Sequence, residues 1–436
     1  MSLDESPYQG YLYAYPHKTA YRKLMPRPLL RDVWAGERQD ALFAYVHVPF
    51  CEMRCGFCNL FTRARPPADQ VTAYLAQLGR QAMEVREALA PDASFARLAI
   101  GGGTPTYLTA PELTEMFGVI EDTLGARGVP LGVETSPATA TADRLAVLTA
   151  HGVTRVSIGV QSFVDAEARA AVRPQKVQEV VAALDTIRAA DVPVLNIDLI
   201  YGIPGQTPET WQYSIDQALR WRPEELFLYP LYVRPLTGLG RRTGTDGLDD
   251  WDGQRLGLYR HAVRVLTDAG YVQQSMRQFR RADVPADDGP DYSCQDDGMV
   301  GLGCGARSYT RDLHYSFDYA VSVTEVRAVI DDYLSRPAED FRYAEFGFRL
   351  DEREQRRRWL LKSVLRAEGL DAAAYAARFG TRHHEDFPQL AELVRRGWLE
   401  EDLGRLTAEG LARSDAIGPW LVSGPVRAAM AGHVLR

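Results

Sequence analysis

The chain has 436 residues, of which 46% are hydrophobic and 25% charged, and its formal net charge is −8. This composition is typical of a globular protein of two or three domains, and the negative charge argues against nucleic acid as the main partner, because phosphate binding requires a basic face. No stretch approaches the roughly 18 apolar residues of a membrane-spanning helix, and the N-terminus lacks the basic and apolar regions of an export signal. We therefore expect a cytoplasmic protein.

Short β-rich runs alternate with helical patterns over more than half of the chain, after an N-terminal arm rich in tyrosine. The expected strands cover residues 43–48, 97–101, 131–135, 155–159, 194–200 and 226–231. The helical patterns between and after them cover residues 69–89, 110–124, 140–150, 175–190, 207–220 and 251–269. Thr109 and Thr207 each precede a proline and an acidic residue in the first turn, which is a typical helix start. A later basic run, residues 353–358, is interspersed with acids and predicts a solvated helix face.

Six successive β-α units predict a parallel sheet whose right-handed crossovers wrap it into a barrel. The expected fold class is therefore α/β, a partial (βα)6 TIM-like barrel with a small, mainly helical C-terminal domain. After residue 270 the alternation stops: residues 283–291 have the composition of a loop, and residues 298–310 indicate a glycine-rich strand and turn. We expect four segments, which are an aromatic arm (1–40), the barrel (41–270), a barrel-completing glycine-rich extension (271–348) and the helical domain (349–436).

Glycines and polar residues follow the expected strands one after another. A cysteine loop follows the first strand, "GGGTPT" follows the second, Glu134 ends the third, Gln161 follows the fourth and Asp198 lies in the fifth. Because the loops at the carboxyl ends of parallel strands build the active site in such folds, we expect these positions to meet on one rim.

Three of the five cysteines, Cys51, Cys55 and Cys58, lie in "HVPFCEMRCGFCNLFT". So few cysteines argue against a disulfide framework and favour metal binding or catalysis. A structural zinc would need a fourth ligand, either His47 or one of the two distant cysteines, whereas three unrelated core cysteines would be a coincidence. A 4Fe–4S cluster fits the loop better, since three thiolates hold three irons and leave the fourth open.

The pattern C-x3-C-x-aromatic-C, with Phe57 before the last cysteine, resembles the signature of the radical S-adenosylmethionine (SAM) enzymes. "YVHVPFC", "GGGTPTYL", "RVSIGVQSF", "NIDLIYGIPGQT" and "GLGCGARSY" follow in an order similar to the oxygen-independent coproporphyrinogen III dehydrogenase (oxidase) branch. The resemblance implies an enzyme in which Cys51, Cys55 and Cys58 are the metal ligands and catalytic residues, and in which SAM binds the fourth iron and is cleaved to a 5′-deoxyadenosyl radical. It also implies a small-molecule substrate and an electron donor such as flavodoxin or ferredoxin, with no nucleic acid or membrane partner.

The same resemblance assigns SAM contacts to ten residues. Glycine suits a backbone that approaches a ligand closely, and acids, an amide and a guanidinium suit the sulfonium, ribose and amino-acid groups of SAM. An apolar position is expected near the adenine. The residues are Tyr45, Phe57, Gly102, Gly103, Thr104, Glu134, Gln161, Arg173, Asp198 and Ile200.

The substrate stays open, because the chain departs from the branch in places. Coproporphyrinogen dehydrogenases carry a cysteine two residues after the third ligand, where this chain has Leu60. Related haem chaperones carry "HNxxYW" upstream of the "GLG" segment, whereas residues 294–299 here lack the His, Tyr and Trp. A third class uses two SAM molecules. The alternatives are therefore a two-SAM methylase or cyclopropanase of natural-product biosynthesis and a non-enzymatic haem chaperone.

Overall fold

The computed structural model describes residues 2–173, 175–242, 251–285, 294–295 and 298–434. One mixed sheet of 13 strands dominates it, in the order β1-β15-β14-β13-β12-β2-β5-β6-β7-β8-β9-β11-β10. The strands are β1 Arg22–Lys23, β2 Leu42–Val48, β3 Phe50–Cys51, β4 Arg63–Ala64, β5 Phe95–Gly102, β6 Leu131–Thr135, β7 Arg155–Gln161, β8 Val194–Tyr201, β9 Glu225–Pro230, β10 Tyr271–Gln273, β11 Gln278–Arg281, β12 Met299–Leu302, β13 Arg307–Tyr309, β14 Leu313–Ser316 and β15 Phe346–Arg349.

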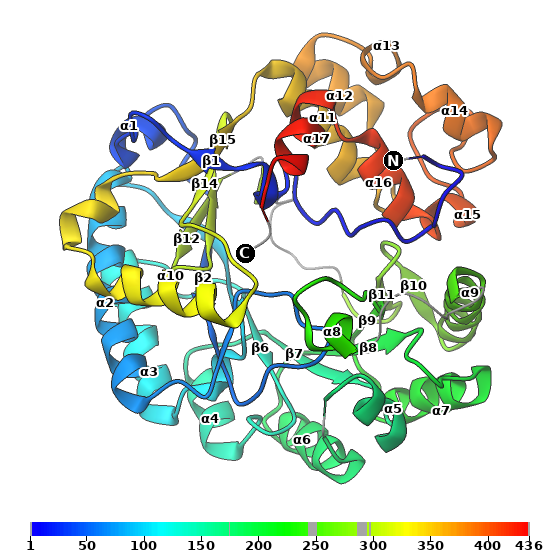
Figure 1. Ribbon diagram of the computed structural model, residues 1–436, viewed down its shortest axis with the longest axis horizontal. Helices are drawn as coiled ribbons and strands as arrows, with labels where there is room; N and C mark the ends of the chain where they lie inside the picture. Colours follow the sequence, from blue (N-terminus) through cyan, green and yellow to red (C-terminus); the bar gives the residue numbers. More distant parts are fainter. Residues whose placement is uncertain (1, 174, 243–250, 286–293, 296–297, 435–436) are drawn as a thin grey trace.

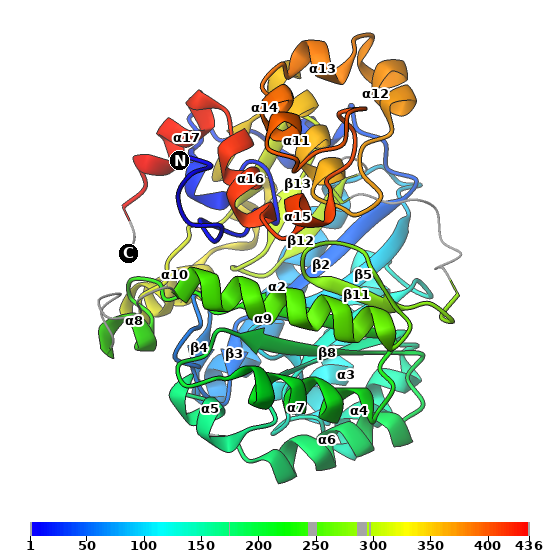
Figure 2. The same ribbon diagram turned by 90° about the vertical axis from the view of Figure 1, so that its right-hand side faces the viewer.

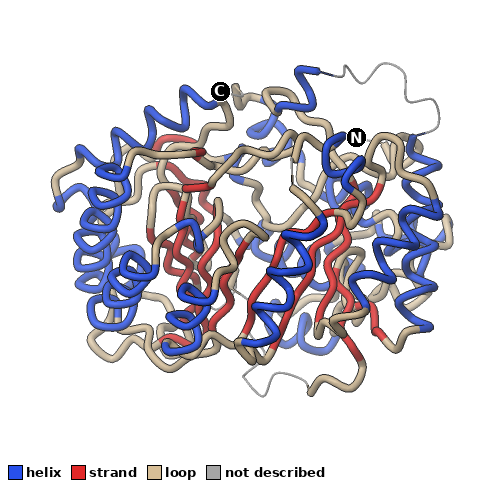
Figure 3. Tube along the Cα trace, turned by 90° about the horizontal axis from the view of Figure 1, so that it is seen from below, coloured by secondary structure: helices blue, strands red, loops and turns tan. Residues whose placement is uncertain are grey.

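The helices are placed mainly outside the curved sheet, so the strands form an inner wall (Figures 1 and 3). The α-helices are α1 Leu30–Trp34, α2 Ala68–Ala88, α3 Ala110–Gly118, α4 Ala142–Ala150, α5 Asp165–Ala170, α6 Val177–Ala189, α7 Pro208–Leu219, α8 Gly238–Arg242, α9 Trp251–Asp268, α10 Val323–Ser335, α11 Glu352–Val364, α12 Ala372–Phe379, α13 His383–Asp386, α14 Leu390–Arg395, α15 Ala408–Leu411, α16 Ser414–Leu421 and α17 Gly424–Ala431. The shorter turns are η1 Lys18–Ala20, η2 Pro105–Tyr107, η3 Val119–Leu124 and η4 Ala338–Arg342. No helix in the described part of the chain is long and apolar enough to cross a membrane.

The predicted parallel barrel is confirmed. Strands β2, β5, β6, β7, β8 and β9 are parallel neighbours in chain order, and each corresponds to one expected strand within a few residues. The α/β class with a helical C-terminal part is therefore as predicted. The sheet is mixed rather than wholly parallel because β12 joins β2 in parallel while β13, β14, β15 and β1 continue antiparallel, and β11 and β10 extend the other end antiparallel.

Local sequence explains where several helices begin. The backbone N–H of Thr109 donates to Oε2 of Glu112 at 2.7 Å at the start of α3, and the N–H of Thr210 donates to the hydroxyl of Thr207 at 3.3 Å at the start of α7. Such caps satisfy N–H groups that have no partner inside the helix. The expected helix at 110–124 is divided, since α3 changes to the π-helical turn η3 at Val119, and α5 was not expected. Of the expected loop at 283–291, residues 286–291 lie outside the described residues.

A second core lies beside the barrel and joins the two ends of the chain. Leu3, Tyr15 and Ala20 of the N-terminal arm pack with Leu360, Tyr375, Leu390, Leu411 and Ile417 of the C-terminal helices. These helices lie between the two ends of the sheet, on the side of the barrel away from α4, α6 and α7 (Figures 1 and 2). The division of the chain into four segments remains a prediction. The N-terminal arm packs in the core of the C-terminal helices and also precedes the first strand of the barrel.

The prediction of a solvated face for residues 353–358 is wrong at two positions, Glu354 and Arg358, which are both buried. Arg358 is fully buried on α11, and its guanidinium Nη1 donates to Nε2 of His314 at 3.0 Å and to the carbonyl of Thr310 at 3.3 Å. Burial and the nearby cation hold the pKa of His314 well below its ordinary value, so the imidazole is neutral and can accept this hydrogen bond. Arg358 thus joins the C-terminal helices to the β13–β14 hairpin.

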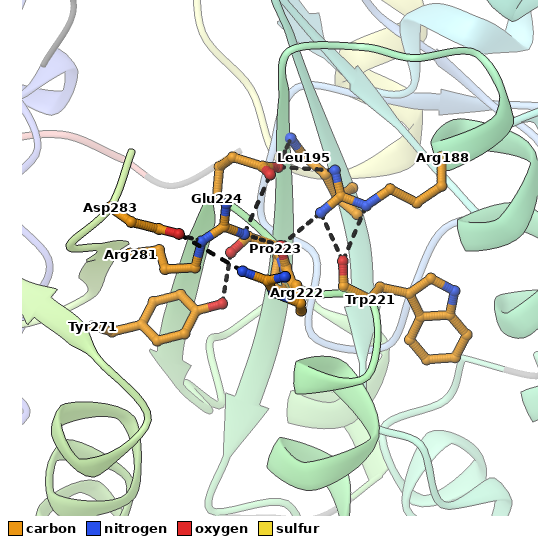
Figure 4. Close-up of polar contacts among 9 residues, drawn as sticks. All are labelled: Arg188, Leu195, Trp221, Arg222, Pro223, Glu224, Tyr271, Arg281 and Asp283. Atoms are coloured by element: carbon orange, nitrogen blue, oxygen red, sulfur yellow. Dashed lines mark hydrogen bonds and ion pairs between the residues drawn. The ribbon is translucent and has the colours of Figure 1, made fainter. Parts of the chain in front are cut away.

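A polar network holds the amino-terminal ends of β8 and β9 (Figure 4). The Glu224 carboxylate accepts from the backbone N–H of Leu195 at 2.9 Å, from Nη1 of Arg188 at 3.0 Å and from Nη1 of Arg281 at 3.3 Å. The Tyr271 hydroxyl donates to the carbonyl of Pro223 at 2.6 Å. Because active sites in parallel barrels lie at the carboxyl ends of the strands, this network at the opposite end serves stability.

Candidate functional site

The cysteine loop begins at the carboxyl end of β2 and is closed at its base. β3 pairs in parallel with β4, so Phe50 lies opposite Arg63 and Cys51 opposite Ala64. The N–H of Arg65 also donates to the carbonyl of Cys51 at 2.9 Å, and that of Cys58 to the carbonyl of Cys55 at 3.1 Å. These bonds form one short closed loop that carries all three thiols.

Each thiol contacts a polar side chain. The Thr104 hydroxyl lies 3.5 Å from Sγ of Cys51, Nη1 of Arg173 lies 3.3 Å from Sγ of Cys55, and the Thr62 hydroxyl lies 3.9 Å from Sγ of Cys58. These donors favour the ionised thiolate. Burial acts in the opposite direction and raises the pKa of Cys51 and of Cys58. Burial thus favours the protonated form of Cys51 and Cys58, whereas a bound metal would favour their thiolates.

The glycine loop lies directly against the cysteine loop. The N–H of Gly103 donates to the carbonyl of Val48 and that of Thr104 to the carbonyl of Phe50, both at 2.7 Å. A Cβ on Gly103 would lie 2.5 Å from the Phe50 carbonyl oxygen and 2.9 Å from Sγ of Cys51. Gly102 has φ +116°, in a region that favours glycine. The contact between the loops therefore depends on the absence of side chains.

Two carboxylates lie inside the barrel near these loops. Oε2 of Glu134 accepts from the N–H of Gly102 at 3.2 Å, and Oδ1 of Asp198 accepts from Nδ2 of Asn196 at 2.7 Å. The surrounding protein raises the pKa of Glu134 and raises that of Asp198 to about 7, despite the hydrogen bonds. Glu134 is nevertheless exposed to solvent.

Arg173 and Gln161 approach from the neighbouring strand end. Nη2 of Arg173 donates to the carbonyl of Gly159 at 2.6 Å, so this guanidinium joins the β7 end to Cys55. Gln161 has φ +71°, where the β7–β8 register shifts between Gly159 and Gln161. A non-glycine residue in this left-handed region costs about 1–3 kcal/mol, and such strain is typical of functional sites.

The apolar and aromatic candidates form two groups. Ile200 packs in a small cluster with Leu231 and Leu239, and Phe57 lies against it. The Tyr45 hydroxyl instead contacts Nδ1 of His47 at 3.3 Å. The predicted rim is thus assembled: thiols, glycines, carboxylates, Gln161 and Arg173 lie at adjoining strand ends, with Phe57 and Ile200 on one side and Tyr45 on the other.

His47 does not complete a zinc site in this arrangement. Its Nε2 lies 3.0 Å from the carbonyl of Phe61, which can only accept, so Nε2 carries the proton and Nδ1 accepts from Tyr45. Burial lowers the pKa of His47 to about 4. In the described ranges, no three His, Cys, Asp or Glu side chains gather as ligands of one metal ion. A cubane cluster bonds its cysteines to separate irons, so it does not need them to converge on one point.

Several charged residues near the site were not predicted. Lys18 of the N-terminal arm and Arg307 of β13 act electrostatically on the groups of the rim, and Arg277 precedes β11. Lys18 and Arg277 belong to no motif, and Arg307 lies within "GLGCGARSY", whose glycines predict only a strand and a turn. Leu60 is 48% exposed, so the position of the relatives' extra cysteine faces solvent.

Comparisons with known proteins agree with this geometry. Residues 45–218 match the radical SAM superfamily. The chain is 28% identical to the oxygen-independent coproporphyrinogen III oxidase of Pseudomonas aeruginosa, over 86% of this chain and 81% of that one, and 27% identical to the haem chaperone HemW of Escherichia coli, over 85% and 95%. Its fold matches that of coproporphyrinogen III oxidase (HemN) from E. coli, described as a radical SAM enzyme, with TM-score 0.77, 22% identity and coverage of 97% and 98%.

Proposed function

We propose that Cys51, Cys55 and Cys58 hold a 4Fe–4S cluster whose open iron binds SAM, because residues 45–218 match the radical SAM superfamily and the chain is similar to coproporphyrinogen III oxidases over most of its length. The observation that carries the proposal is the closed β3–β4 loop, which holds three buried or half-buried thiols in one short segment and sets Cys51 against the glycine loop. When bound, the cluster and SAM supply reductive cleavage to methionine and a 5′-deoxyadenosyl radical that abstracts hydrogen from a substrate.

The residues of the chain would position these groups and exclude water. Thr104 and Arg173 donate to cysteine sulfurs, which would stabilise the thiolate charge. Gly102 and Gly103 leave a backbone surface that SAM can approach, and Glu134, Gln161 and Asp198 supply polar groups for its ribose and amino-acid part. Ile200 and Phe57 would pack near the adenine, and Tyr45 would contact SAM from the β2 side. An external donor such as flavodoxin or ferredoxin would supply the electron.

Anaerobic reconstitution tests the proposal. The protein should bind about four irons and four sulfides per chain and, with dithionite and SAM, release 5′-deoxyadenosine. Cys55→Ala removes the thiol that contacts Arg173 and should abolish both the cluster and the cleavage. Cys294→Ala, which changes a cysteine outside the loop, is the matched control and should retain both. SAM cleavage that persists in Cys55→Ala would refute the assignment.

The product identifies the reaction. The named relatives favour oxidative decarboxylation of coproporphyrinogen III, which predicts loss of carbon dioxide from that substrate. S-adenosylhomocysteine together with a mass gain on the substrate would instead identify a two-SAM methylase or cyclopropanase. The likeness to HemW supports a third candidate, a haem chaperone, which predicts stoichiometric haem binding with an absorbance shift when haem is titrated into the apoprotein.

A further inference from the structure

The N-terminal arm crosses the open end of the barrel, between the C-terminal helices and the barrel centre (Figure 1). It is fixed there, since the N–H of Gly10 donates to the carbonyl of Asp415 at 3.0 Å and the Arg277 guanidinium lies 3.8 Å from the Tyr11 ring centre. Tyr11 and Tyr13 nevertheless expose 41% and 36% of their surface. Two fixed aromatic side chains with this much solvent contact border open space beside the site.

Two cations converge on the hydroxyl of Tyr13. Nη1 of Arg307 donates to it at 2.9 Å, and the Lys18 ammonium acts on it electrostatically. Lys18 lies 3.6 Å above the ring centre of Tyr319, which limits the positions its ammonium can take. His17 lies 3.4 Å from the same hydroxyl through Nε2, but burial and the nearby cations lower its pKa well below the ordinary value, so it adds no charge.

No carboxylate of the described residues forms an ion pair with Lys18 or Arg307. The groups that raise the pKa of Arg307 are the tyrosines Tyr13, Tyr309 and Tyr21, and those that raise the pKa of Lys18 are Tyr13 and Cys58. Two cations within reach of one phenol repel each other and lose solvation, which is unfavourable unless an anion joins them. The arrangement therefore suits a ligand with negative charge.

Lys18 lies between a pocket and the cysteine loop. A pocket of about 220 Å³ is lined by Lys18, Tyr21, Tyr319 and His433, together with the carboxylate of Asp318, whose Oδ1 accepts from the N–H of Tyr319 at 2.8 Å. On the other side, the Tyr319 hydroxyl donates to the carbonyl of Asn59 at 3.2 Å, and Lys18 acts electrostatically on Cys58. An anion held by Lys18 would thus lie next to the loop that carries the proposed cluster.

We propose that Lys18, Tyr13 and Arg307 bind one anionic group of the substrate, a carboxylate or a phosphate, and so orient the substrate toward the cysteine loop. The proposal rests on the proposed function, which places the reacting centre at the cysteine loop. It concerns this one anionic group of the substrate and not the remainder. Two charged donors and a phenol around one point can form three hydrogen bonds to such a group.

Calorimetric titration of inorganic phosphate and of glutarate into the cluster-reconstituted, SAM-saturated protein tests the proposal. One anion should bind per chain, and the tighter of the two identifies phosphate or carboxylate as the natural group. Lys18→Met and Arg307→Met should each weaken binding at least tenfold, as expected for the loss of a charged hydrogen bond. Tyr13→Phe keeps both cations, so it should weaken binding severalfold even if a cation variant fails to fold.

The matched controls remove the same charge outside the pocket. Lys176→Met changes an exposed lysine just before α6, and Arg311→Met changes an exposed arginine four residues beyond Arg307, so both should change binding less than twofold. Failure of the wild-type protein to bind either anion, or equal losses in variants and controls, would overturn the proposal. Wild-type protein that cleaves SAM but binds neither anion overturns this inference alone, whereas anion binding without SAM cleavage overturns the proposed function alone.

Discussion

Replacing Asp415 by asparagine should loosen the attachment of the C-terminal helices to the barrel. Asp415 lies on α16 and is 1% exposed, and its Oδ2 accepts hydrogen bonds from Nη2 of Arg277 and from the hydroxyl of Tyr232. Arg277 is itself 4% exposed. Asp415→Asn keeps the shape of the side chain but leaves the Arg277 charge buried without a counter-charge.

The loss is large relative to the whole stability. Removing one partner of a buried ion pair costs about 3–5 kcal/mol, whereas a domain is stable by only about 5–15 kcal/mol. The double variant Arg277→Met with Asp415→Leu should recover at least half of the loss, because it removes both charges and fills the space with apolar groups. Glu368→Gln breaks the exposed pair with Arg366 and should cost at most about 1 kcal/mol.

Urea unfolding followed by circular dichroism measures these differences. A chain of this size unfolds in more than one step, so the relevant quantity is the free energy of the earliest transition. Asp415→Asn should lower that free energy several times more than Glu368→Gln. A loss below about 1 kcal/mol, or a double variant no better than the single one, would refute the reasoning that the buried charge needs its partner.

Two further changes test the site. In Gly103→Ala the new Cβ clashes with the Phe50 carbonyl and the Cys51 sulfur, so the iron bound after reconstitution should fall below half of the wild-type amount. The control Gly118→Ala adds a Cβ with no neighbour within 4 Å and should bind iron normally. Equal iron content in the two variants would contradict the clash. Asp198 has its pKa raised to about 7 from 3.8, so the native state holds its proton more tightly and loses this contribution as pH rises from about 4 to 7. Asp198→Asn should therefore raise the thermal midpoint of the apoprotein, relative to wild type, more at pH 8 than at pH 5, and a pH-independent difference would contradict the raised pKa.

The barrel and the rim could be predicted because their signals are local. Alternating strands and helices in the first part of the chain define parallel neighbours, and parallel neighbours place Glu134, Gln161 and Asp198 at one end. The structure brings these residues to the same end of the sheet as the cysteine loop. Their roles in binding SAM stay a prediction, because sequence and fold indicate only where these residues lie.

The unpredicted features depend on contacts between distant parts of the chain. Arg358 belongs to a charged run whose local pattern indicates exposure, and only the packing of α11 against the β13–β14 hairpin buries it beside His314. Lys18 and Arg307 are nearly 300 positions apart, so no spacing rule joins them to Tyr13. The left-handed conformation at position 161 could not be predicted either, because the residue there is glutamine and not glycine.

The cysteines occupy one short loop, whereas Tyr13, Lys18 and Arg307 come from the N-terminal arm and from β13, outside the six-stranded parallel core. Substitutions, insertions or recombination in the arm or in the β13 hairpin can therefore reshape what the barrel mouth recognises while the cysteine loop stays intact. Proteins with this architecture can therefore diverge in the substrate that they bind, while the segment that carries the reaction stays constant.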